Sequence, residues 1–443
     1  MRIEIPKSVL EILEELNKAK YEAYIVGGCV RDYLLGEEPA DWDITTNATP
    51  DKVKEVFGKT VDTGIKHGTV TVIKKGIGYE VTTYRIDGEY EDSRHPKNVE
   101  FTASLEEDLK RRDFTINAMA YHPEYGLVDL FGGREDLDNK LIRAVGSARE
   151  RFSEDALRMM RAVRFAAKLG FEIEADTYEA IKELAPTISK ISAERIQVEM
   201  TKLLVSNNPY KFKMFYETGL TKVFMPEFDR TMETEQNHPH HQYSVGEHIL
   251  HSLEYVPSDK VLRLTMLFHD IAKSETVTID KKGITHFYGH QEKSGQMAEN
   301  ILKRLKYDND TIASVYTLAA NHDRDILPNK ASVRRAMNRF GKELTMMLMQ
   351  VKYADVMAQS MYKREEKLKL IDDVNEVCQQ VIDESECFQL SMMAVSGRDL
   401  IEAGIAPGKQ IGIILNEMLD DVLDNPEHNE RTYLLDTYVL SKK

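Results

Sequence analysis

The sequence predicts an α+β fold, in which a small N-terminal head with a mixed sheet and helices precedes a long all-helical remainder. Short apolar or alternating runs closed by glycine occupy the chain up to about residue 130. From Ser153 onward the apolar residues recur at helical spacing, with turns at YETGL, VPSD and GIAPGKQIG. At 443 residues, the chain is long enough for about three domains.

The first expected element is a helix, because Val9, Leu10, Leu13 and Leu16 recur at helical spacing. Strands are expected next at YEAYIVGG, GTVTVIKKG, GYEVTTYRI and YGLVDLFGG. After residue 140 we expect three helical segments, at 141–230, 231–360 and 361–443. The sequence therefore predicts functional residues on an N-terminal sheet and on the helices that follow it.

Charge and cysteine content restrict the class of protein. A net charge of −15 argues against a protein that coats nucleic acid indiscriminately, yet KRRDF and RMMRAVRFAAK are basic segments where a polyanion would bind. The three cysteines are too few and too unevenly placed for a disulfide framework, so we expect a reducing compartment, the cytoplasm. The charged N-terminal stretch is not a signal peptide, and no run predicts a membrane span. A homodimer is compatible with the sequence, which does not fix the oligomeric state.

The stretch YIVGGCVRDYLLGEEPADWDITT concentrates polar residues beside an apolar strand pattern. Asp41 and Asp43, at i and i+2 on a strand, would point to one face about 6.6 Å apart, a spacing that suits a pair of divalent cations. Gly27 and Gly28 would let backbone N–H groups approach a phosphate, and Arg31 would add charge-assisted contacts. Either a DxD or a GG alone is usually a surface turn. Together they predict a cradle for metal and triphosphate.

GGxVRDxLLG followed within ten residues by DxD resembles the nucleotidyltransferase motif of the polymerase-β superfamily. It is more closely similar to that of the class II tRNA nucleotidyltransferases and bacterial poly(A) polymerases. The resemblance implies that Asp41 and Asp43 bind Mg²⁺, with a further carboxylate on a neighbouring strand. Glu80 in GYEVTTYR is the best placed by pattern, although an ordinary solvent-facing glutamate explains that position equally well.

Arg111, Arg112 and Asp113 precede the apolar run FTINAMAY. A basic cluster on a solvated face is the usual explanation for such residues. The string also resembles the ribose-selecting motif of the same family, which implies that Arg112 and Asp113 contact the sugar hydroxyls and that Asn117 positions the triphosphate. Upstream, DSRHP at 92–96 resembles a loop element needed for the final adenosine addition, with His in place of the second Arg. This disfavours an enzyme that adds only the two cytidines.

In SEDALRMMRAVRFAAKLGF we expect a helix with Ser153 as its N-cap and with Glu154 and Asp155 in its first turn. Asp155, Arg158 and Arg161 would share a broad face, as they also would in a salt-bridged surface helix. The stretch resembles the EDxxR amino-acid template of class II CCA-adding enzymes. This implies that Asp155 and Arg158 read the base, that Glu154 orients Arg158, and that Arg161 helps hold the nucleotide. Poly(A) polymerases carry a related helix.

Nine of the thirteen histidines fall between His238 and His322, an enrichment that suggests a metal site. Imidazole and carboxylate are apt ligands for borderline divalent metals. The order of the elements resembles the HD phosphohydrolase domain, which implies a second divalent metal (Ni²⁺, Mn²⁺, Fe²⁺ or Zn²⁺) and action on phosphoesters, with the ligands His248, His269, Asp270, His290, His322 and Asp355. His238, His240 and His241 are expected to be loop residues without a role.

The resemblance as a whole implies a tRNA nucleotidyltransferase that adds or repairs the 3′-terminal CCA of tRNA from CTP and ATP with Mg²⁺. The expected segments are a catalytic head (1–140), a neck that binds nucleotide and tRNA (141–230), an HD domain (231–360) and a tRNA-binding tail (361–443). An A-adding enzyme or a poly(A) polymerase is the nearest alternative. An HD phosphohydrolase with a vestigial head and a non-catalytic RNA-binding scaffold are the others.

Overall fold

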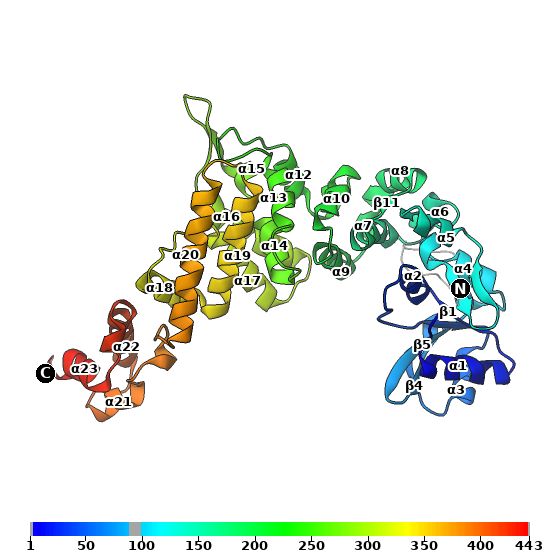
Figure 1. The fold of residues 1–443 in the computed structure, drawn as a ribbon, viewed down its shortest axis with the longest axis horizontal. Helices are drawn as coiled ribbons and strands as arrows, with labels where there is room; N and C mark the ends of the chain where they lie inside the picture. Colours follow the sequence, from blue (N-terminus) through cyan, green and yellow to red (C-terminus); the bar gives the residue numbers. More distant parts are fainter. Residues whose placement is uncertain (1–2, 88–98, 442–443) are drawn as a thin grey trace. The chain divides into compact units, whose positions relative to one another are not determined.

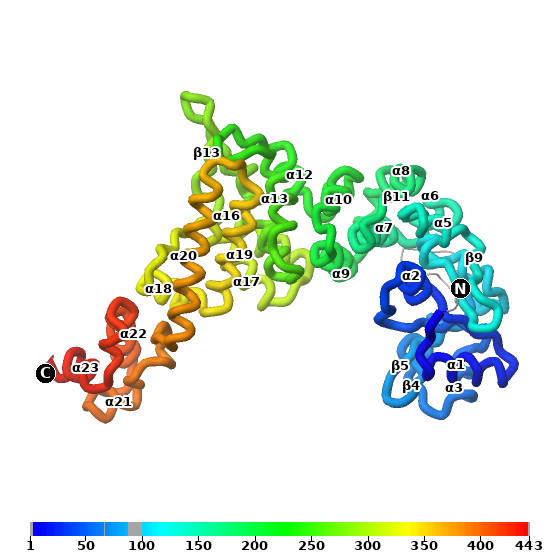
Figure 2. The backbone as a smooth tube through the Cα atoms, viewed as in Figure 1, coloured from blue at the N-terminus to red at the C-terminus, as the bar shows by residue number. Residues whose placement is uncertain are grey.

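The computed structural model describes residues 3–87 and 99–441. It divides into two compact units, Met1–Pro226 and Glu227–Lys443. Figures 1 and 2 trace the chain from a sheet in the first unit to the helices of the second. The expected fold class, a mixed-sheet head followed by a helical remainder, is confirmed. The DSRHP element at 92–96 lies outside the described residues, and no described helix is long and apolar enough to cross a membrane.

The head is built on a seven-stranded sheet with the order β3-β4-β5-β2-β1-β8-β9. Strand β2 runs parallel to β5, and the other neighbouring strands are antiparallel. The four expected strands are present as β1, β4, β5 and β9. The bounds are β1 Ala23–Val26, β2 Ile44–Thr46, β3 Thr60–Gly64, β4 Thr69–Lys74, β5 Ile77–Thr83, β8 Met119–His122 and β9 Gly126–Asp129. Three shorter pairs are β6 Arg85–Asp87 with β7 Val99–Phe101, β10 Leu141–Ile142 with β11 Glu172–Ile173, and β12 Val277–Ile279 with β13 Thr285–Phe287.

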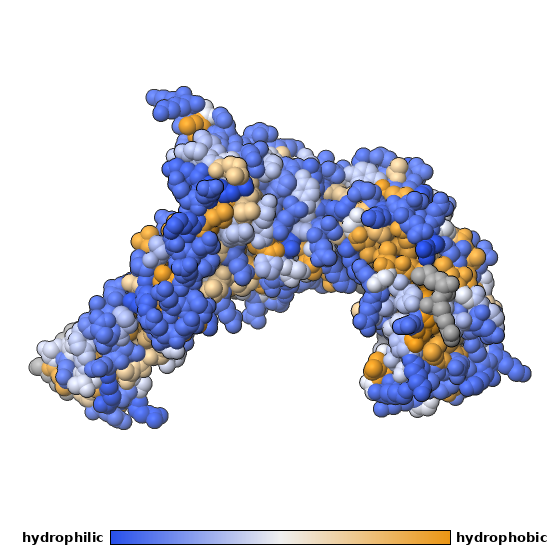
Figure 3. All heavy atoms as spheres, in the orientation of Figure 1, coloured by the Kyte–Doolittle hydropathy of each residue, from blue (hydrophilic) through white to orange (hydrophobic). Residues whose placement is uncertain are grey.

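Helix α1 (Lys7–Lys18) forms where the apolar spacing predicts it and packs against β1 and against α3 (Pro50–Val56). It buries Val9, Ile12, Leu13 and Leu16, whereas Leu10 is only half-buried. The other helices of the first unit are α2 Gly28–Leu34, α4 Leu105–Lys110, α5 Gly133–Asp138, α6 Ala148–Glu154, α7 Leu157–Leu169, α8 Ala175–Leu184, α9 Ala193–Leu204, α10 Lys213–Glu217 and α11 Thr221–Phe224. In the view of Figure 3, hydrophilic residues cover most of the surface and hydrophobic residues gather around α7.

One helix boundary differs from the expectation. Ser153 is not an N-cap but lies inside α6, whose N-cap is Ser147, with its hydroxyl accepting from Glu150 N–H at 3.4 Å. The backbone of Asp155 is extended (φ −137°, ψ 104°), so the chain breaks there, and α7 begins at Leu157. The Asp155 carboxylate accepts from Leu157 N–H at 3.0 Å. Asp155 therefore precedes the arginine helix instead of lying in its first turn.

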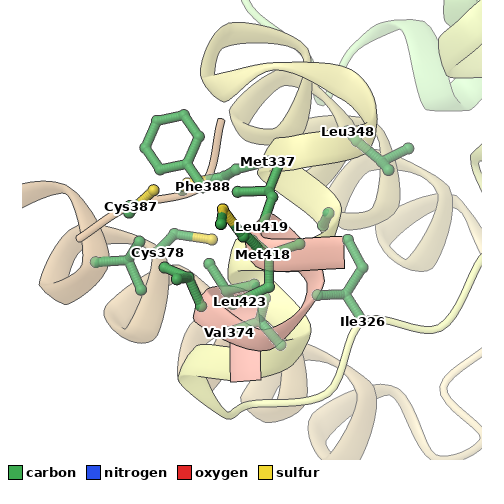
Figure 4. Packing of buried hydrophobic residues seen from close by; sticks show 14 of the residues in the cluster. Ile326, Met337, Leu348, Val374, Cys378, Cys387, Phe388, Met418, Leu419 and Leu423 are labelled. Carbon is green, nitrogen blue, oxygen red and sulfur yellow. The ribbon is translucent and has the colours of Figure 1, made fainter. Parts of the chain in front are cut away.

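The second unit is helical apart from the β12–β13 hairpin, which departs from the expected all-helical remainder. Its apolar core, part of which is shown in Figure 4, includes Met337, Val374, Cys378 and Met418. α12 spans the boundary between the two units. The bounds are α12 Pro226–Met232, α13 Val245–Leu253, α14 Lys260–Phe268, α15 Lys273–Thr276, α16 His290–Arg304, α17 Asn309–Asn321, α18 Lys330–Phe340, α19 Lys342–Ala358, α20 Arg364–Asp383, α21 Gly397–Glu402, α22 Lys409–Asp424 and α23 Arg431–Leu435.

Candidate functional site

The paired carboxylates lie at the edge of β2. Val26 N–H of β1 donates to the Asp43 carbonyl at 3.0 Å, so the ladder reaches Asp43, one residue before β2 begins. Asp41 lies outside β2, in a segment that makes no ladder with β1 in the described part of the chain. The expectation that both residues lie on the strand is therefore wrong. Both residues retain access to solvent, although the carboxylate of Asp43 has lost part of its hydration to its neighbours.

Glu80 lies on the strand next to these acids. Ile44 pairs with Val81 in the parallel β2–β5 ladder, and this register places Glu80 beside Asp43. Loss of hydration raises the pKa of Asp43 above its ordinary value, and the charges of Glu80 and Asp41 add to the rise, whereas Arg112 opposes it. Carboxylates that repel one another in this way form a donor set that suits a hard divalent cation.

Gly27 makes room for an arginine. Its φ of +81° is in the left-handed region, and a Cβ built there would lie 3.1 Å from Nη1 of Arg112. Gly27 N–H donates to the Met119 carbonyl at 3.1 Å, so this N–H group is already hydrogen-bonded to the sheet. Of the expected pair, Gly28 at the start of α2 is therefore better placed to offer its N–H to a phosphate.

A partly buried polar network connects four of the predicted nucleotide-binding residues. Arg31 donates from Nη1 to Oδ1 of Asn117 at 2.5 Å, and Asn117 donates from Nδ2 to Oδ1 of Asp113 at 3.1 Å. Arg161 of α7 donates from Nε and Nη2 to Oδ2 of Asp113 at 2.8 and 2.6 Å. Burial alone would raise the pKa of Asp113, but Arg161 and Asn117 lower it below its ordinary range. The network joins α2, α7 and the turn at 113–117 into one rigid wall.

The predicted base-reading residues surround the break between α6 and α7. Arg158 donates from Nη1 to Glu154 at 2.7 Å and from Nη2 to the Arg111 carbonyl at 3.0 Å. Oδ2 of Asp155 accepts from Nη2 of Arg195 at 2.7 Å. Glu154 therefore contacts Arg158, as expected, and both side chains that are predicted to read the base are held by neighbours.

Arg195 and Asp108 were not among the predicted site residues, although each bonds to a residue that was. Arg195 on α9 holds Asp155 from 40 residues away. Asp108 is fully buried and accepts from Arg111 and Arg112, at 2.7 and 3.3 Å respectively. The spacing of four residues between Asp108 and Arg112 is the signal in the sequence that could have indicated their ion pair, whereas Arg195 left no local signal.

In the second unit the predicted metal ligands converge. The ligands form two groups, and within each group the ligand atoms all lie within 4.8 Å of one another. One group is His248, His269, Asp270 and Asp355, and the other is Asp270, His290 and His322. Asp270 belongs to both. Its Oδ2 lies 3.5 Å from Nε2 of His248 and 3.4 Å from that of His269. Its Oδ1 lies 3.2 Å from Nε2 of His290 and 3.6 Å from that of His322.

All four histidines have the same orientation. Each Nδ1 faces a backbone carbonyl: Ala358 for His248 (3.4 Å), Met266 for His269 (2.8 Å), Phe287 for His290 (2.7 Å) and Ala319 for His322 (2.8 Å). A neutral imidazole that donates from Nδ1 offers the lone pair of Nε2 to the interior of the cluster. Such carbonyl partners fix the tautomer of metal-binding histidines, so the donor set fits divalent cations.

Positive charge and a cavity adjoin the cluster. Nζ of Lys273 lies 2.7 Å from Oδ2 of Asp270. Burial alone would raise the pKa of Asp270, but Lys273 and the histidines hold it well below its ordinary value. A cavity of about 370 Å³ opens onto the cluster and is also lined by Lys367 and by the loop histidines His238, His240 and His241. These three are loop residues, as expected, but they line the cavity over the cluster. Their concentration in the sequence was the feature that could have predicted this position.

A seven-stranded head with paired acids at a strand edge, followed by an arginine helix, defines a nucleotidyltransferase. Residues 23–143 match the family model described as Poly A polymerase head domain, and residues 170–232 match the probable RNA and SrmB-binding site of polymerase A. Residues 276–438 match a model for tRNA nucleotidyltransferase domain 2.

Relatives that match nearly the whole chain identify one family within the nucleotidyltransferases. The CCA-adding enzyme of Ligilactobacillus salivarius is 37% identical over 432 residues, which cover 97% of this chain and 95% of that protein. That of Limosilactobacillus reuteri is 38% identical over 436 residues, covering 96% and 94% respectively. The crystal structure of the Bacillus stearothermophilus CCA-adding enzyme in complex with CTP superposes with a TM-score of 0.74 at 29% identity, covering 98% of both chains. The chain belongs to the family of CCA-adding enzymes.

Proposed function

We propose that this protein adds or repairs the 3′-terminal CCA of tRNA, using CTP and ATP without a nucleic-acid template. In the reaction the 3′-oxygen of the tRNA bonds to the α-phosphorus of the nucleotide and pyrophosphate leaves. The observation that carries the proposal is the presence, in one compact unit, of paired acids at the β2 edge, of Asp155 held by Arg195 and of Arg158 held by Glu154. The family relation supports the same conclusion.

Asp41 and Asp43, with Glu80 beside them, would hold Mg²⁺ in the head. The pKa of Asp43 is raised chiefly by loss of hydration and further by the charges of Glu80 and Asp41, and this supports the assignment, since a divalent cation stabilises crowded carboxylates. When bound, Mg²⁺ neutralises phosphate charge and favours ionisation of the attacking hydroxyl. The remaining groups act by positioning: Gly28 and Arg31 at the triphosphate, and Arg112 and Asp113 at the ribose.

The experiment that tests the proposal uses tRNA transcripts ending at the discriminator base, at C and at CC, with CTP, ATP or both. We expect three, two and one added nucleotides respectively, resolved on a sequencing gel. Addition of adenosine only to the CC transcript would indicate an A-adding enzyme instead. Long adenosine tails on all three would indicate a poly(A) polymerase.

We predict that Arg158→Ala blurs the choice between CTP and ATP more than it slows addition. A good hydrogen-bonded pair discriminates between bases by about 1–3 kcal/mol, so the preference should fall roughly 5- to 150-fold. Glu154 keeps Arg151 as a partner at 2.6 Å, so the fold should survive. The measurement is the ratio of kcat/KM for the two nucleotides on the transcripts ending at C and CC. Arg149→Ala, which removes an exposed ion pair between α6 and Glu183 of α8, is the matched control. An unchanged ratio in Arg158→Ala would contradict the template role.

A second function is favoured by the metal cluster. We propose that the segment 231–360 is an HD-type domain whose six ligands would hold divalent cations, and Asp270, whose two oxygens face different histidine pairs, would contribute to both ligand groups. When bound, such ions polarise a phosphoryl oxygen and acidify water. The associated reaction is phosphoester hydrolysis, in which water adds to phosphorus, the ester P–O bond breaks and the alcohol leaves with a proton from water.

The remaining assignments complete the proposal. The head at 1–140 carries catalysis, the neck at 141–230 binds nucleotide and tRNA, and the tail at 361–443 binds tRNA. The three cysteines are free and buried, which supports a reducing, cytoplasmic compartment.

A further inference from the structure

The cavity over the metal cluster continues into a second one. A smaller cavity of about 200 Å³ lies beside α19 and α20. Five residues line both cavities: His322, Asp323, Asp355, Gln359 and Lys367. Because two of these belong to the cluster, the cavities meet at its edge. One ligand can therefore reach from the cluster into the smaller cavity, which we call the side chamber.

The two halves of this cleft differ in chemistry. Over the cluster, the ammonium groups of Lys273 and Lys367 add positive charge to that of the proposed cations, which suits a phosphate. The side chamber has apolar walls, formed by Ile326, Met349, Val356, Leu370, Ile371 and Val374. Figure 4 shows Ile326 and Val374 at the apolar core of this unit, which gives these walls a rigid support.

Seven polar residues line the side chamber, and two of them, the donor Lys352 and the acceptor Asp325, do not also line the larger cavity. Lys352 is half-buried. Loss of hydration lowers the pKa of its ammonium group, and the negative charges of Asp323, Asp355 and Asp325 oppose this decrease. Asp325 lines only the side chamber, whereas Asp323 also lines the larger cavity and accepts from Gln291 at 3.1 Å. Lys352 can donate to a ring nitrogen, and Asp325 can accept from an amino group.

Apolar walls together with a donor and an acceptor that belong to the side chamber alone, Lys352 and Asp325, fit a nucleobase. Adenine and cytosine each present an amino group beside an acceptor nitrogen, whereas uracil presents a carbonyl and an N–H at the equivalent positions. We propose that the cleft binds an adenine or cytosine nucleoside phosphate, with the phosphate over the metal cluster and the base in the side chamber. This inference rests on the proposed metal centre and adds its substrate class, supplied either as a free nucleotide or as the end of an RNA chain.

The test measures ligand binding to the full-length protein loaded with Ni²⁺. Titration calorimetry with adenosine 3′-monophosphate, uridine 3′-monophosphate and inorganic phosphate should give an affinity at least roughly tenfold higher for the adenosine ligand than for the other two. Lys352→Met should lower the adenosine affinity roughly ten- to a hundredfold, and Ile371→Phe should lower it by obstructing the chamber, while phosphate binding stays unchanged. The head is identical in all variants, so any difference in affinity between them arises in the second unit.

Asp372→Asn, on an exposed position of α20 next to Ile371, is the matched control and should bind like the unmodified protein. Equal affinities for adenosine 3′-monophosphate and phosphate, with a full metal complement by elemental analysis, would overturn the base chamber alone. Absence of bound metal would overturn the metal centre and this inference with it. A short RNA with a 3′-terminal adenosine phosphate, titrated in parallel, identifies an RNA end if it binds as well as the free nucleotide, and a free nucleotide if it does not.

Discussion

Asp43→Ala is expected to abolish nucleotide addition while leaving tRNA binding largely intact. Asp43 is the acid that the β1–β2 ladder holds in place, and its pKa is raised by loss of hydration and, to a smaller extent, by the charges of Glu80 and Asp41. Removing one preorganised charged group from such a site costs about 10²- to 10³-fold or more in rate. The measurement is single-turnover CTP incorporation into a tRNA transcript, with tRNA affinity from filter binding.

Asp51→Ala provides the comparison for this variant, because Asp51 is an exposed acid of the same unit at the first turn of α3. It should incorporate CTP at the unmodified rate. If Asp43→Ala retained more than about a tenth of the activity, the assignment of Asp43 as a metal ligand would be wrong.

Asp270→Asn is expected to remove the metal from the second unit. Asp270 belongs to both ligand groups, and an amide of the same shape cannot supply the anionic charge that two cations require. Elemental analysis of the full-length protein should show the metal of this centre reduced to background. Hydrolysis of a 2′,3′-cyclic nucleotide with Ni²⁺ or Mn²⁺ should fall with it, whereas CCA addition should continue.

The variant also leaves the buried Lys273 without its anionic partner, so thermal unfolding must be followed in parallel. Asp372→Asn is again the control, since it makes the same chemical change at an exposed site. A folded Asp270→Asn protein that kept its full metal content would contradict the shared-ligand geometry.

Much of the fold follows from local patterns, and the errors have local causes. Strands closed by glycine were predicted because a turn residue marks their ends, as at Gly27 after β1. Strand β8 was missed because the run FTINAMAY lacks alternation, its residues being buried on both faces. Ser153 followed by two acids imitates an N-cap, yet α6 is capped earlier at Ser147 and the chain breaks at Asp155, where Arg195 binds the carboxylate.

The sequence by itself determined the types of chemistry: paired acids beside glycines, an arginine-rich helix and a set of histidines with two acids. These signals lie in residues whose identity alone limits the chemistry they can perform. Only the tertiary structure decided which groups meet. Asp113 and Arg161 are 48 residues apart, Asp155 and Arg195 are 40 apart, and the side chamber depends on how α19 packs on α20. Contacts of this range arise when apolar faces pack and bring distant segments together, so no short stretch of sequence carries them.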